Sequence, residues 1–454
     1  MSQSSPGEAL ANLRQRNQFA TLCNIVFATV IYWVVQRKLI FKTYAANGVV
    51  TARHTDGVGG LLYWATVGLA VCLLMAGNAA SNSRTGLFQL VAICLLALWW
   101  GAWRLPTTRA ALVMGLMAYG MSVVLLPLAA GLDATTHGAL ARLQAGDAPC
   151  ASRLTLWSNV IDLIQQKPLL GWGWGNLDYA HYINLYPGER FCDILDNAHN
   201  LPLHLAVELG VPFALLFCGL VIWRIVRLKP WAETDATRQL AWTVLMVIGL
   251  HSLVEYPLWY GPFQMTVGLC IWMLWERPGP IKADDQMGNL ALGRVVEPVT
   301  ADLNDTTAGT IGFKPKRSLA QTVTAQAAII SIVFLGVVAW DYWRVSQIYL
   351  QPESRAASYK QDTLAKSSET WFFKDTARFA QLSIMQLKPD NAQQVYDLAL
   401  GLLPYSPEAR VVEKLIESAT MLGRLDEAVF HLARFKAAFP QDYEAWRVKT
   451  GVAN

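Results

Sequence analysis

Long apolar runs recur along this sequence and restrict the folds that are open to it. A helix needs about 20 mostly apolar residues to cross the hydrocarbon core of a bilayer. Eight runs approach this length, at residues 19–36, 59–78, 86–103, 110–130, 203–223, 239–256, 261–275 and 323–340. They predict an all-α polytopic membrane protein with about eight transmembrane helices.

The composition agrees with a membrane protein. Of the 454 residues, 54% are hydrophobic and 15% are charged, whereas a soluble domain has about 25% charged residues. This balance excludes an ordinary cytosolic enzyme, a disordered protein and a nucleic-acid-binding protein. The seven cysteines lack the C-x-x-C spacing of a zinc or redox site.

Basic residues orient the predicted spans, because lysine and arginine gather in cytoplasmic loops. They are frequent in segments 37–53, 104–109 and 224–238, which we therefore place in the cytoplasm. The loop 131–202 carries four basic and seven acidic residues, as expected on the opposite side of the membrane. Eight spans would place both termini on that far side as well.

Six segments follow from this topology. They are N-terminal transmembrane helices (1–130), a far-side loop (131–202), further transmembrane helices (203–275), a flexible cytoplasmic loop (276–322), the last transmembrane helix (323–340) and a soluble far-side helical domain (341–454). The last segment shows amphipathic helical spacing, and its Gly-Arg-Leu-Asp-Glu-Ala turn is typical of helical-hairpin (TPR-like) repeats.

The loop 131–202 contains the densest group of unusual residues. Trp172 and Trp174 alternate with glycines, which favour a turn. The run predicts either a tight turn with tryptophan anchors at the membrane interface or backbone amides that approach a phosphate or a sugar. Cys150 and Cys192 are the loop's two cysteines, and they either form a disulfide in an oxidising compartment or stay unpaired.

Histidines follow at the point where this loop meets the next predicted span. His199 is a candidate base near neutral pH, or alternatively a helix-capping residue. His204 and Glu208 are spaced i, i+4, which favours a structural pair over a metal site. Because no third ligand has metal spacing, we predict no catalytic metal.

Ionisable groups at the ends of spans are candidate functional residues. Glu255 and Tyr256 end one span, in a stretch that alternatively forms an aromatic belt. Arg84 and Arg153 could bind phosphate oxygens through their planar guanidinium groups, or simply anchor the chain at the interface. The topology brings a base, cations and polar groups to one membrane face from separate segments: Gln15, Arg84, Arg153, His199, Glu255 and Tyr256.

These motifs resemble a known family. The run from Arg153 to Trp174, the Asp-Asn-Ala-His-Asn-Leu motif at 196–201 and the Glu-Leu-Gly at 208–210 resemble the O-antigen ligase/polymerase (Wzy_C) superfamily. The His-Ser-Leu-Val-Glu-Tyr-Pro-Leu-Trp-Tyr stretch at 251–260 and the tail that follows Asp341 resemble its PglL-type protein O-oligosaccharyltransferases. The resemblance covers nearly the whole chain.

The resemblance implies a GT-C-like, multi-pass glycosyltransferase in a Gram-negative inner membrane, with its active site facing the periplasm. Such enzymes take a glycan from undecaprenyl diphosphate without a metal or another cofactor. Protein-directed members pass it to a serine or threonine hydroxyl, often of a pilin, whereas ligases pass it to lipid A–core and polymerases to a sugar. The implied partners are a lipid-linked glycan, an acceptor protein such as pilin and the lipid bilayer, but no nucleic acid.

The family motifs imply roles for individual residues. His199 matches the essential loop histidine, Gln15 the glutamine of a Gln-x-Asn motif, and Tyr256 the tyrosine of Glu-Tyr-Pro, so these three are the predicted catalytic residues. A second group is predicted to bind substrate: Arg84, Arg153, Glu255, Asn200, Trp172 and Trp174.

The resembled family has several more spans before the Gln-x-Asn motif. An odd number of missing spans would return the N-terminus, with Arg14 and Arg16, to the cytoplasm. We therefore expect an N-terminally truncated form or a misassigned start. Two other classes stay open: a scaffold whose tail binds partners, which needs no Arg/His/Gln cluster, and a transporter, for which charges within the spans are scarce.

Overall fold

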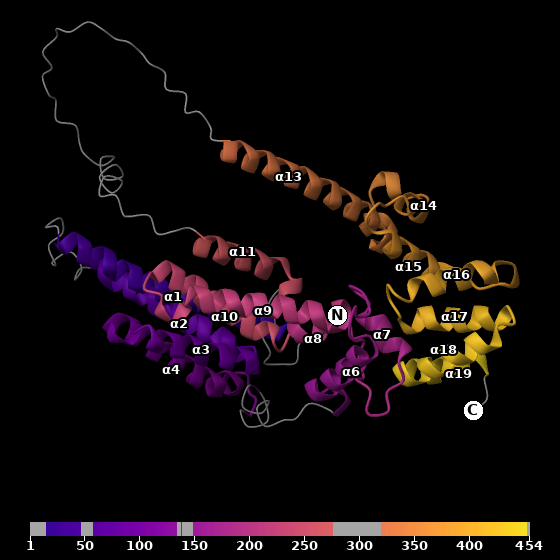
Figure 1. The fold of residues 1–454 in the computed structure, drawn as a ribbon, viewed down its shortest axis with the longest axis horizontal. Helices are drawn as coiled ribbons and strands as arrows, with labels where there is room; N and C mark the ends of the chain where they lie inside the picture. Colours follow the sequence, from indigo (N-terminus) through magenta and orange to yellow (C-terminus); the bar gives the residue numbers. More distant parts are fainter. Residues whose placement is uncertain (1–14, 47–57, 134–137, 139–148, 276–318, 452–454) are drawn as a thin grey trace, which may run out of the picture. The chain divides into compact units, whose positions relative to one another are not determined.

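The computed structural model describes residues 15–46, 58–133, 138, 149–275 and 319–451, and these residues form helices and connecting segments without a β-strand. The predicted all-helical fold is therefore confirmed for the described part of the chain. The chain divides into two compact units, Met1–Arg277 and Pro278–Asn454. Figure 1 labels the helices of both units.

The α-helices of the first unit are α1 (Arg16–Ala46), α2 (Val58–Ala80), α3 (Arg84–Trp99), α4 (Pro106–Ala129), α6 (Arg153–Gln166), α7 (Leu177–Ile183), α8 (Leu201–Leu209), α9 (Val211–Leu228), α10 (Ala236–Ser252) and α11 (Gly261–Trp275). Those of the second unit are α13 (Leu319–Ser346), α14 (Thr363–Ser367), α15 (Lys374–Ile384), α16 (Ala392–Leu402), α17 (Ala409–Met421), α18 (Leu425–Ala438) and α19 (Pro440–Thr450).

Five helical segments among the described residues are long and apolar enough to cross a membrane. They are Arg16–Arg37, Gly59–Ala80, Pro106–Ala129, Val211–Ala232 and Ile329–Tyr349. The chain is therefore a multi-pass membrane protein with five candidate spans. The other three predicted spans coincide with the shorter helices α3, α10 and α11, of 16, 17 and 15 residues.

The structure divides the predicted span 203–223 into two helices, α8 and α9. Gly210 lies between them with a φ of +90°. A Cβ atom at this position would lie 2.1 Å from the carbonyl oxygen of Leu169, so the close backbone approach requires glycine. The candidate span consequently begins at Val211, and α8 belongs to the folded loop that precedes it.

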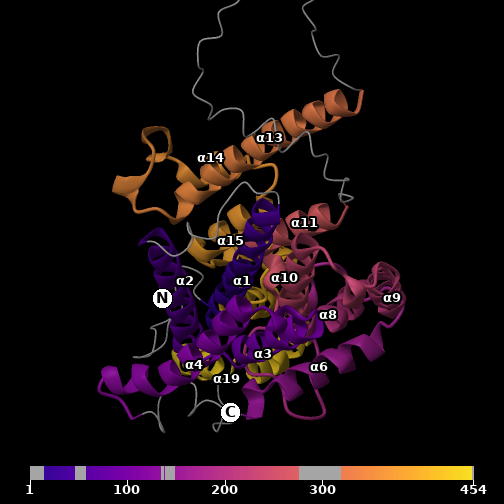
Figure 2. The same cartoon turned by 90° about the vertical axis from the view of Figure 1, so that its left-hand side faces the viewer.

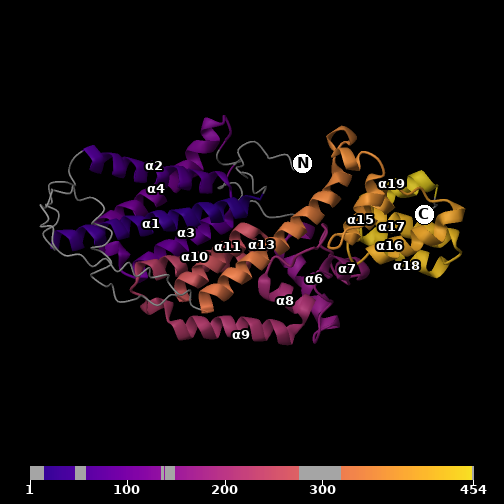
Figure 3. The same cartoon turned by 90° about the horizontal axis from the view of Figure 1, so that it is seen from above.

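Helix α1 forms the centre of a helix bundle in the first unit. It packs against α2, α3, α4 and α10, and α10 also packs against α11. Figures 2 and 3 show this bundle from two further directions. Its core is filled by fully buried apolar side chains, among them Phe27, Met75, Leu90 and Leu112.

The predicted loop 131–202 contains folded helices. Helices α6, α7 and α8 enclose a second apolar core, in which the buried side chains include Leu156, Val160, Leu163, Leu177, Leu195 and Val207. Helix α9 packs against α8. We call this folded segment, α6 to α8, the loop domain. The first residue of α6, Arg153, and the cap of α8, Asn200, both contact the segment that follows α10.

The second unit begins with α13, which extends to Ser346 instead of ending at 340. Helices α16, α17, α18 and α19 then pack against their neighbours in chain order, as helical hairpins do. Each helix buries one face, with Val395 of α16, Leu415 of α17 and Phe435 of α18 among the buried side chains. Residues 276–318 of the predicted cytoplasmic loop lie outside the described residues.

Candidate active site

Glu255 lies at the centre of a polar cluster, three residues after the end of α10. Its side chain is 5% exposed, and both of its carboxylate oxygens accept hydrogen bonds. Nδ1 of His199 lies 2.7 Å from Oε2, while Nδ2 of Asn17 donates to Oε1 at 3.1 Å. Arg153 forms an ion pair with the same Oε1. We call Glu255, His199, Asn17 and Arg153 the Glu255 cluster.

The backbone of His199 is held in an unusual conformation. Its φ is +48°, in the left-handed region that residues other than glycine seldom adopt. The side chain of Asn197 accepts a hydrogen bond from the amide of His199 at 2.9 Å. Such strain persists where the surroundings fix it, and it is common at functional sites.

Asn200 connects the start of α8 to the segment that follows α10. Its Oδ1 accepts from the amide of Leu203 at 3.0 Å, so it caps α8. Its Nδ2 donates to the carbonyl of Leu253 at 2.9 Å. Both polar atoms of this predicted substrate-binding side chain are thus used to hold His199 close to Glu255.

The pairing with Glu255 also selects the tautomer of a neutral His199. A carboxylate can only accept, so the neutral imidazole carries its hydrogen on Nδ1 and leaves Nε2 able to accept a proton. The imidazole is 17% exposed, which gives a substrate access to it. The ring of Tyr256 meets the imidazole edge-on, with centroids 4.8 Å apart, and stacks on Tyr260 at 5.9 Å.

The Gln-x-Asn motif reaches the cluster through Asn17. Ser83 donates from Oγ to Oδ1 of Asn17 at 2.7 Å, while the Nδ2 of Asn17 donates to Glu255. The Oε1 of Gln15 instead accepts from the backbone amide of Gln18 at 2.8 Å, in the first turn of α1. Asn17 is the cluster residue that the sequence reasoning missed, although the motif contains it.

The two predicted phosphate-binding arginines both begin helices near the cluster. Arg153 is the first residue of α6, which Ser152 caps by accepting from the amide of Thr155 at 3.1 Å. Arg84 is exposed and is the first residue of α3, directly after Ser83. Helix N-termini carry partial positive charge, so both arginines add to a positive potential there.

The Gly-Trp-Gly-Trp-Gly run binds the end of α8. The amide of Trp172 donates to the carbonyl of Val207 at 2.8 Å, and that of Gly173 donates to Glu208 at 2.9 Å. A Cβ atom at Gly171 would lie 2.4 Å from the carbonyl oxygen of Glu208. Of the two readings, the structure supports the tight turn, because these two amides are already occupied by protein carbonyls.

The two tryptophans of this run have different surroundings. Trp172 packs against the core of the loop domain, and its Nε1 donates to the carbonyl of Leu163 at 3.0 Å. Trp174 is 62% exposed and stacks on Trp259 with centroids 6.1 Å apart. Both exposed indoles make T-shaped contacts with the ring of His204. Trp174 and Trp259 therefore form a surface platform, whereas Trp172 stabilises the loop domain.

His204 and Glu208 form the predicted i, i+4 pair. Nε2 of His204 lies 3.3 Å from Oε2 of Glu208, and the two side chains are 2% and 1% exposed. Nδ1 of His204 accepts from the amide of Ala198 at 3.4 Å. No group of three or more His, Cys, Asp or Glu side chains within the described residues could hold a metal ion.

A disulfide links the two segments that carry Arg153 and His199. Cys150 and Cys192 are bonded, with Cα atoms 5.3 Å apart, and the amide of Cys192 donates to the carbonyl of Cys150 at 3.2 Å. Cys150 lies in the short helix Pro149–Ala151, immediately before α6. The bond thus holds the N-terminus of α6 next to the segment that leads to His199.

Helix α7 carries two titratable groups with shifted pKa values. Burial lowers the pKa of His181 to about 3, and the positive charge of Arg190 acts in the same direction. Burial raises the pKa of Asp178 to about 7, with a further contribution from the negative charges of Asp196 and Glu208. His181 is therefore neutral at all moderate pH values, whereas Asp178 changes its charge near neutrality.

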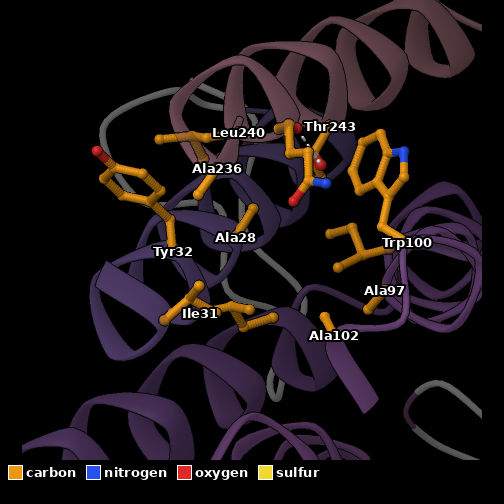
Figure 4. Close-up of a pocket in the computed structure, with 12 residues that line it drawn as sticks. Ala28, Ile31, Tyr32, Ala97, Trp100, Ala102, Ala236, Leu240 and Thr243 are labelled. Carbon is orange, nitrogen blue, oxygen red and sulfur yellow. Dashed lines mark hydrogen bonds between the residues drawn. The ribbon is translucent and has the colours of Figure 1, made fainter. Parts of the chain in front are cut away.

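A small cavity in the bundle is separate from this site (Figure 4). It has a volume of about 60 Å³ and lies between α1, α3 and α10, where Tyr32, Trp100 and Leu240 contribute to its lining. Tyr32 follows Asn17 by 15 residues on α1, which corresponds to roughly 22 Å along the helix axis. The cavity therefore plays no part in the chemistry of the Glu255 cluster.

Comparison with protein families gives two matches. A family model described as O-antigen ligase matches residues 65–218, and one described as the C-terminal part of a virulence factor membrane-bound polymerase matches residues 239–451. The first match includes His199 and Arg153, and the second includes Glu255, Tyr256 and nearly all of the tail.

Two curated relatives from Acinetobacter baylyi are also similar to the chain. The ComP-specific O-oligosaccharyltransferase is 24% identical over 273 residues, which cover 59% of this chain and 44% of the relative. The General O-oligosaccharyltransferase is 28% identical over 214 residues, covering 44% of this chain and 36% of the relative. The chain thus spans less than half the length of either relative. No solved structure matches it significantly.

Proposed function

The chain belongs to the O-antigen ligase family, and from this premise we propose that it transfers a glycan from undecaprenyl diphosphate to a serine or threonine hydroxyl of an acceptor protein such as a pilin. The reaction would take place at the Glu255 cluster, on the periplasmic face of a Gram-negative inner membrane. The observation that carries the proposal is the convergence of His199 and Arg153 on one buried carboxylate.

His199 is the proposed base. Glu255 holds its Nδ1 at 2.7 Å, so Nε2 is the atom that accepts the proton of the acceptor hydroxyl. As the hydroxyl oxygen attacks the anomeric carbon, a glycosidic bond forms and the bond from that carbon to the diphosphate oxygen breaks. The bonding electrons leave with undecaprenyl diphosphate, and the anomeric configuration inverts.

Arg153 and Arg84 are the proposed phosphate-binding residues. Arg153 pairs with Glu255 through one terminal nitrogen and is 36% exposed, so its other donors are free to reach a diphosphate oxygen. Arg84 would approach from the beginning of α3. Diphosphate is a good leaving group, and two cations at its oxygens stabilise the charge that develops as it departs.

The remaining predicted residues would position the two substrates, the lipid-linked glycan and the acceptor. Tyr256 lies against His199, where its ring can contact the sugar that undergoes substitution. Gln15 caps α1 through its oxygen, which leaves its amide nitrogen for a substrate hydroxyl or phosphate. Trp174, with Trp259, offers an exposed indole surface on which a sugar ring can stack.

A protein acceptor is supported by the relatives, whose names describe O-oligosaccharyltransferases, one of them ComP-specific. The second candidate is transfer of the glycan to lipid A–core, or to another glycan, by the same base and leaving group. The description of the family model over residues 65–218 as O-antigen ligase favours that alternative.

Expression in a Gram-negative host that lacks its own oligosaccharyltransferase and ligase tests the proposal. The host would supply a lipid-linked glycan, a candidate pilin and lipid A–core, and it would carry either the natural chain or His199→Ala. We expect glycosylated pilin that disappears in the variant. Glycan on lipid A–core would establish the ligase reaction, and absence of transfer to either acceptor would favour a scaffold.

A further inference from the structure

A buried carboxylate fixes the start of the tail domain against α13. Asp341 is fully buried, although it lies within the candidate span Ile329–Tyr349. Its Oδ2 accepts from Oγ1 of Thr370 at 2.7 Å and from the backbone amides of Trp371 and Phe372 at 2.9 Å each. Three donors on one oxygen hold this turn firmly beside the helix.

The held turn folds back along the apolar part of α13. The ring of Phe372 meets the ring of Phe334 with centroids 5.9 Å apart. Phe334 precedes Asp341 by seven residues, which is about 10 Å along the helix axis. Phe334 lies within the candidate span Ile329–Tyr349, on the other side of its midpoint from Asp341. Phe372 therefore reaches a level of α13 that a membrane would surround.

The two aromatic side chains at the tip of this turn are exposed on the described part of the second unit. Trp371 is 66% exposed and Phe372 is 49% exposed. Phe372 adjoins Phe334 of the span, and Phe334 and Trp340 are themselves exposed. Such large aromatic side chains gain most from burial, and they are enriched where a membrane meets water.

Arg344, one turn after Asp341 on α13, forms further hydrogen bonds to the segment that precedes the turn. Its Nη2 donates to the carbonyl of Lys366 at 3.1 Å, and its Nε donates to the hydroxyl of Tyr359 at 3.2 Å. These bonds join the segment before α15 to the last turn of α13. The turn with its exposed rings thus moves together with the span, because it is bonded to the span on both sides.

We propose that Trp371 and Phe372 insert into the lipid leaflet that surrounds α13, as a second membrane attachment of the tail domain. The occupant of this surface is the acyl and interfacial region of the bilayer that α13 crosses. A second insertion point restricts tilting of the domain relative to the membrane, so helices α15–α19 keep one inclination to the membrane surface. This proposal does not depend on the transferase reaction.

Photo-cross-linking of the full chain in phospholipid nanodiscs tests the insertion. Benzoylphenylalanine would replace Phe372, or Trp371 in a second variant, and lipid adducts would be measured by mass spectrometry. Ile332 of the span and Val448 of α19, which are 68% and 77% exposed, are the matched positive and negative positions. We expect lipid adducts at positions 371, 372 and 332, and none at position 448.

Two results would overturn the insertion. One is a lipid adduct at 332 without any at 371 or 372, which would place the turn in water. The other is cross-linking of 371 and 372 to protein, which would show that a partner or a second copy covers the surface. Both variants replace exposed side chains, and resistance of the tail to limited proteolysis would verify that each has folded.

Discussion

Nδ1 of His199 lies 2.7 Å from Oε2 of Glu255, which joins the end of a folded loop domain to the end of a bundle helix. The carboxylate is buried and also pairs with Arg153, whereas the opposite imidazole nitrogen is left for a substrate. The dyad therefore combines a fixed tautomer with an accessible imidazole nitrogen. The sequence suggested that Glu255 binds substrate; on these contacts we propose instead that it positions His199.

Glu255→Gln keeps the shape of the side chain but removes its charge. We expect glycan transfer to fall about 10- to 100-fold, because the residue that orients and supports the histidine is altered. The pH–rate profile should change as well, since a charged group next to the proposed base is gone. Steady-state transfer rates across pH measure both effects.

The matched control for this change is Glu353→Gln, at an exposed carboxylate of the second unit. Its transfer rate and pH profile should equal those of the natural chain. A Glu255→Gln variant with an unaltered rate and profile would show that the dyad has no part in the reaction.

Asn17→Ala removes a donor to the buried carboxylate and an acceptor for Ser83. A hydrogen bond to a charged group contributes about 1.5–3 kcal/mol, so transfer should fall roughly tenfold or more. Gln165→Ala, at an exposed position of α6, serves as the control. Normal transfer by Asn17→Ala combined with loss in Gln15→Ala would mean that the glutamine, not the asparagine, carries the function of the motif.

Asp178 makes the stability of the loop domain depend on pH. Its pKa is raised from 3.8 to about 7 in the folded chain. The stabilising effect is therefore complete below the unfolded pKa and is lost as the pH rises through 7. Asp178→Asn keeps a neutral side chain at every pH. The variant should be more stable than the natural chain, and this gain should be larger at about pH 8 than at about pH 5. The difference between the two gains should be ~1–3 kcal/mol in the free energy of unfolding.

Thermal unfolding of the purified chain at the two pH values measures this difference. Asp193→Asn, at an exposed position in the same loop, should show no such pH dependence. An Asp178→Asn variant whose stability gain shrinks toward higher pH would contradict the sign of the effect.

Removing the disulfide should loosen both segments that it joins. The double change Cys150→Ser and Cys192→Ser is expected to cost about 2–4 kcal/mol of stability. Transfer should slow as well, because Arg153 follows the bond closely and His199 lies shortly after Cys192. Melting temperature and transfer rate test this, with Cys72→Ser on the exposed surface of α2 as control. Equal melting temperatures for the double variant and the natural chain would contradict it.

The sequence predicted the helices well where burial in a membrane dictates them. Apolar runs of span length located the helices of the bundle, and two motifs pointed to His199 and Glu255. The break at Gly210 was not predictable, because it depends on the approach of Leu169, a contact between separate segments. The short length of α10 is likewise set by the Asp235 cap at its start and by the turn that follows Ser252.

The pairing of the site residues could not be read from the sequence. His199 and Glu255 are separated by 56 residues, and Arg153 and Glu255 by 102, so only the fold reveals that they share one carboxylate. Asn17 was missed because the choice between it and Gln15 depends on where α1 starts. Trp172 was predicted to bind substrate, yet its indole faces the core of the loop domain.

The central claim, that His199 acts as a base held by Glu255, is tested most directly by chemical rescue. Initial transfer rates would be measured with the purified chain, a lipid-linked glycan and a serine-containing acceptor, for the natural chain and His199→Gly, each with and without imidazole. We predict a loss of about 10²- to 10⁴-fold, partly restored by imidazole in the variant alone. A folded His199→Gly variant that transfers glycan at the natural rate would contradict the account.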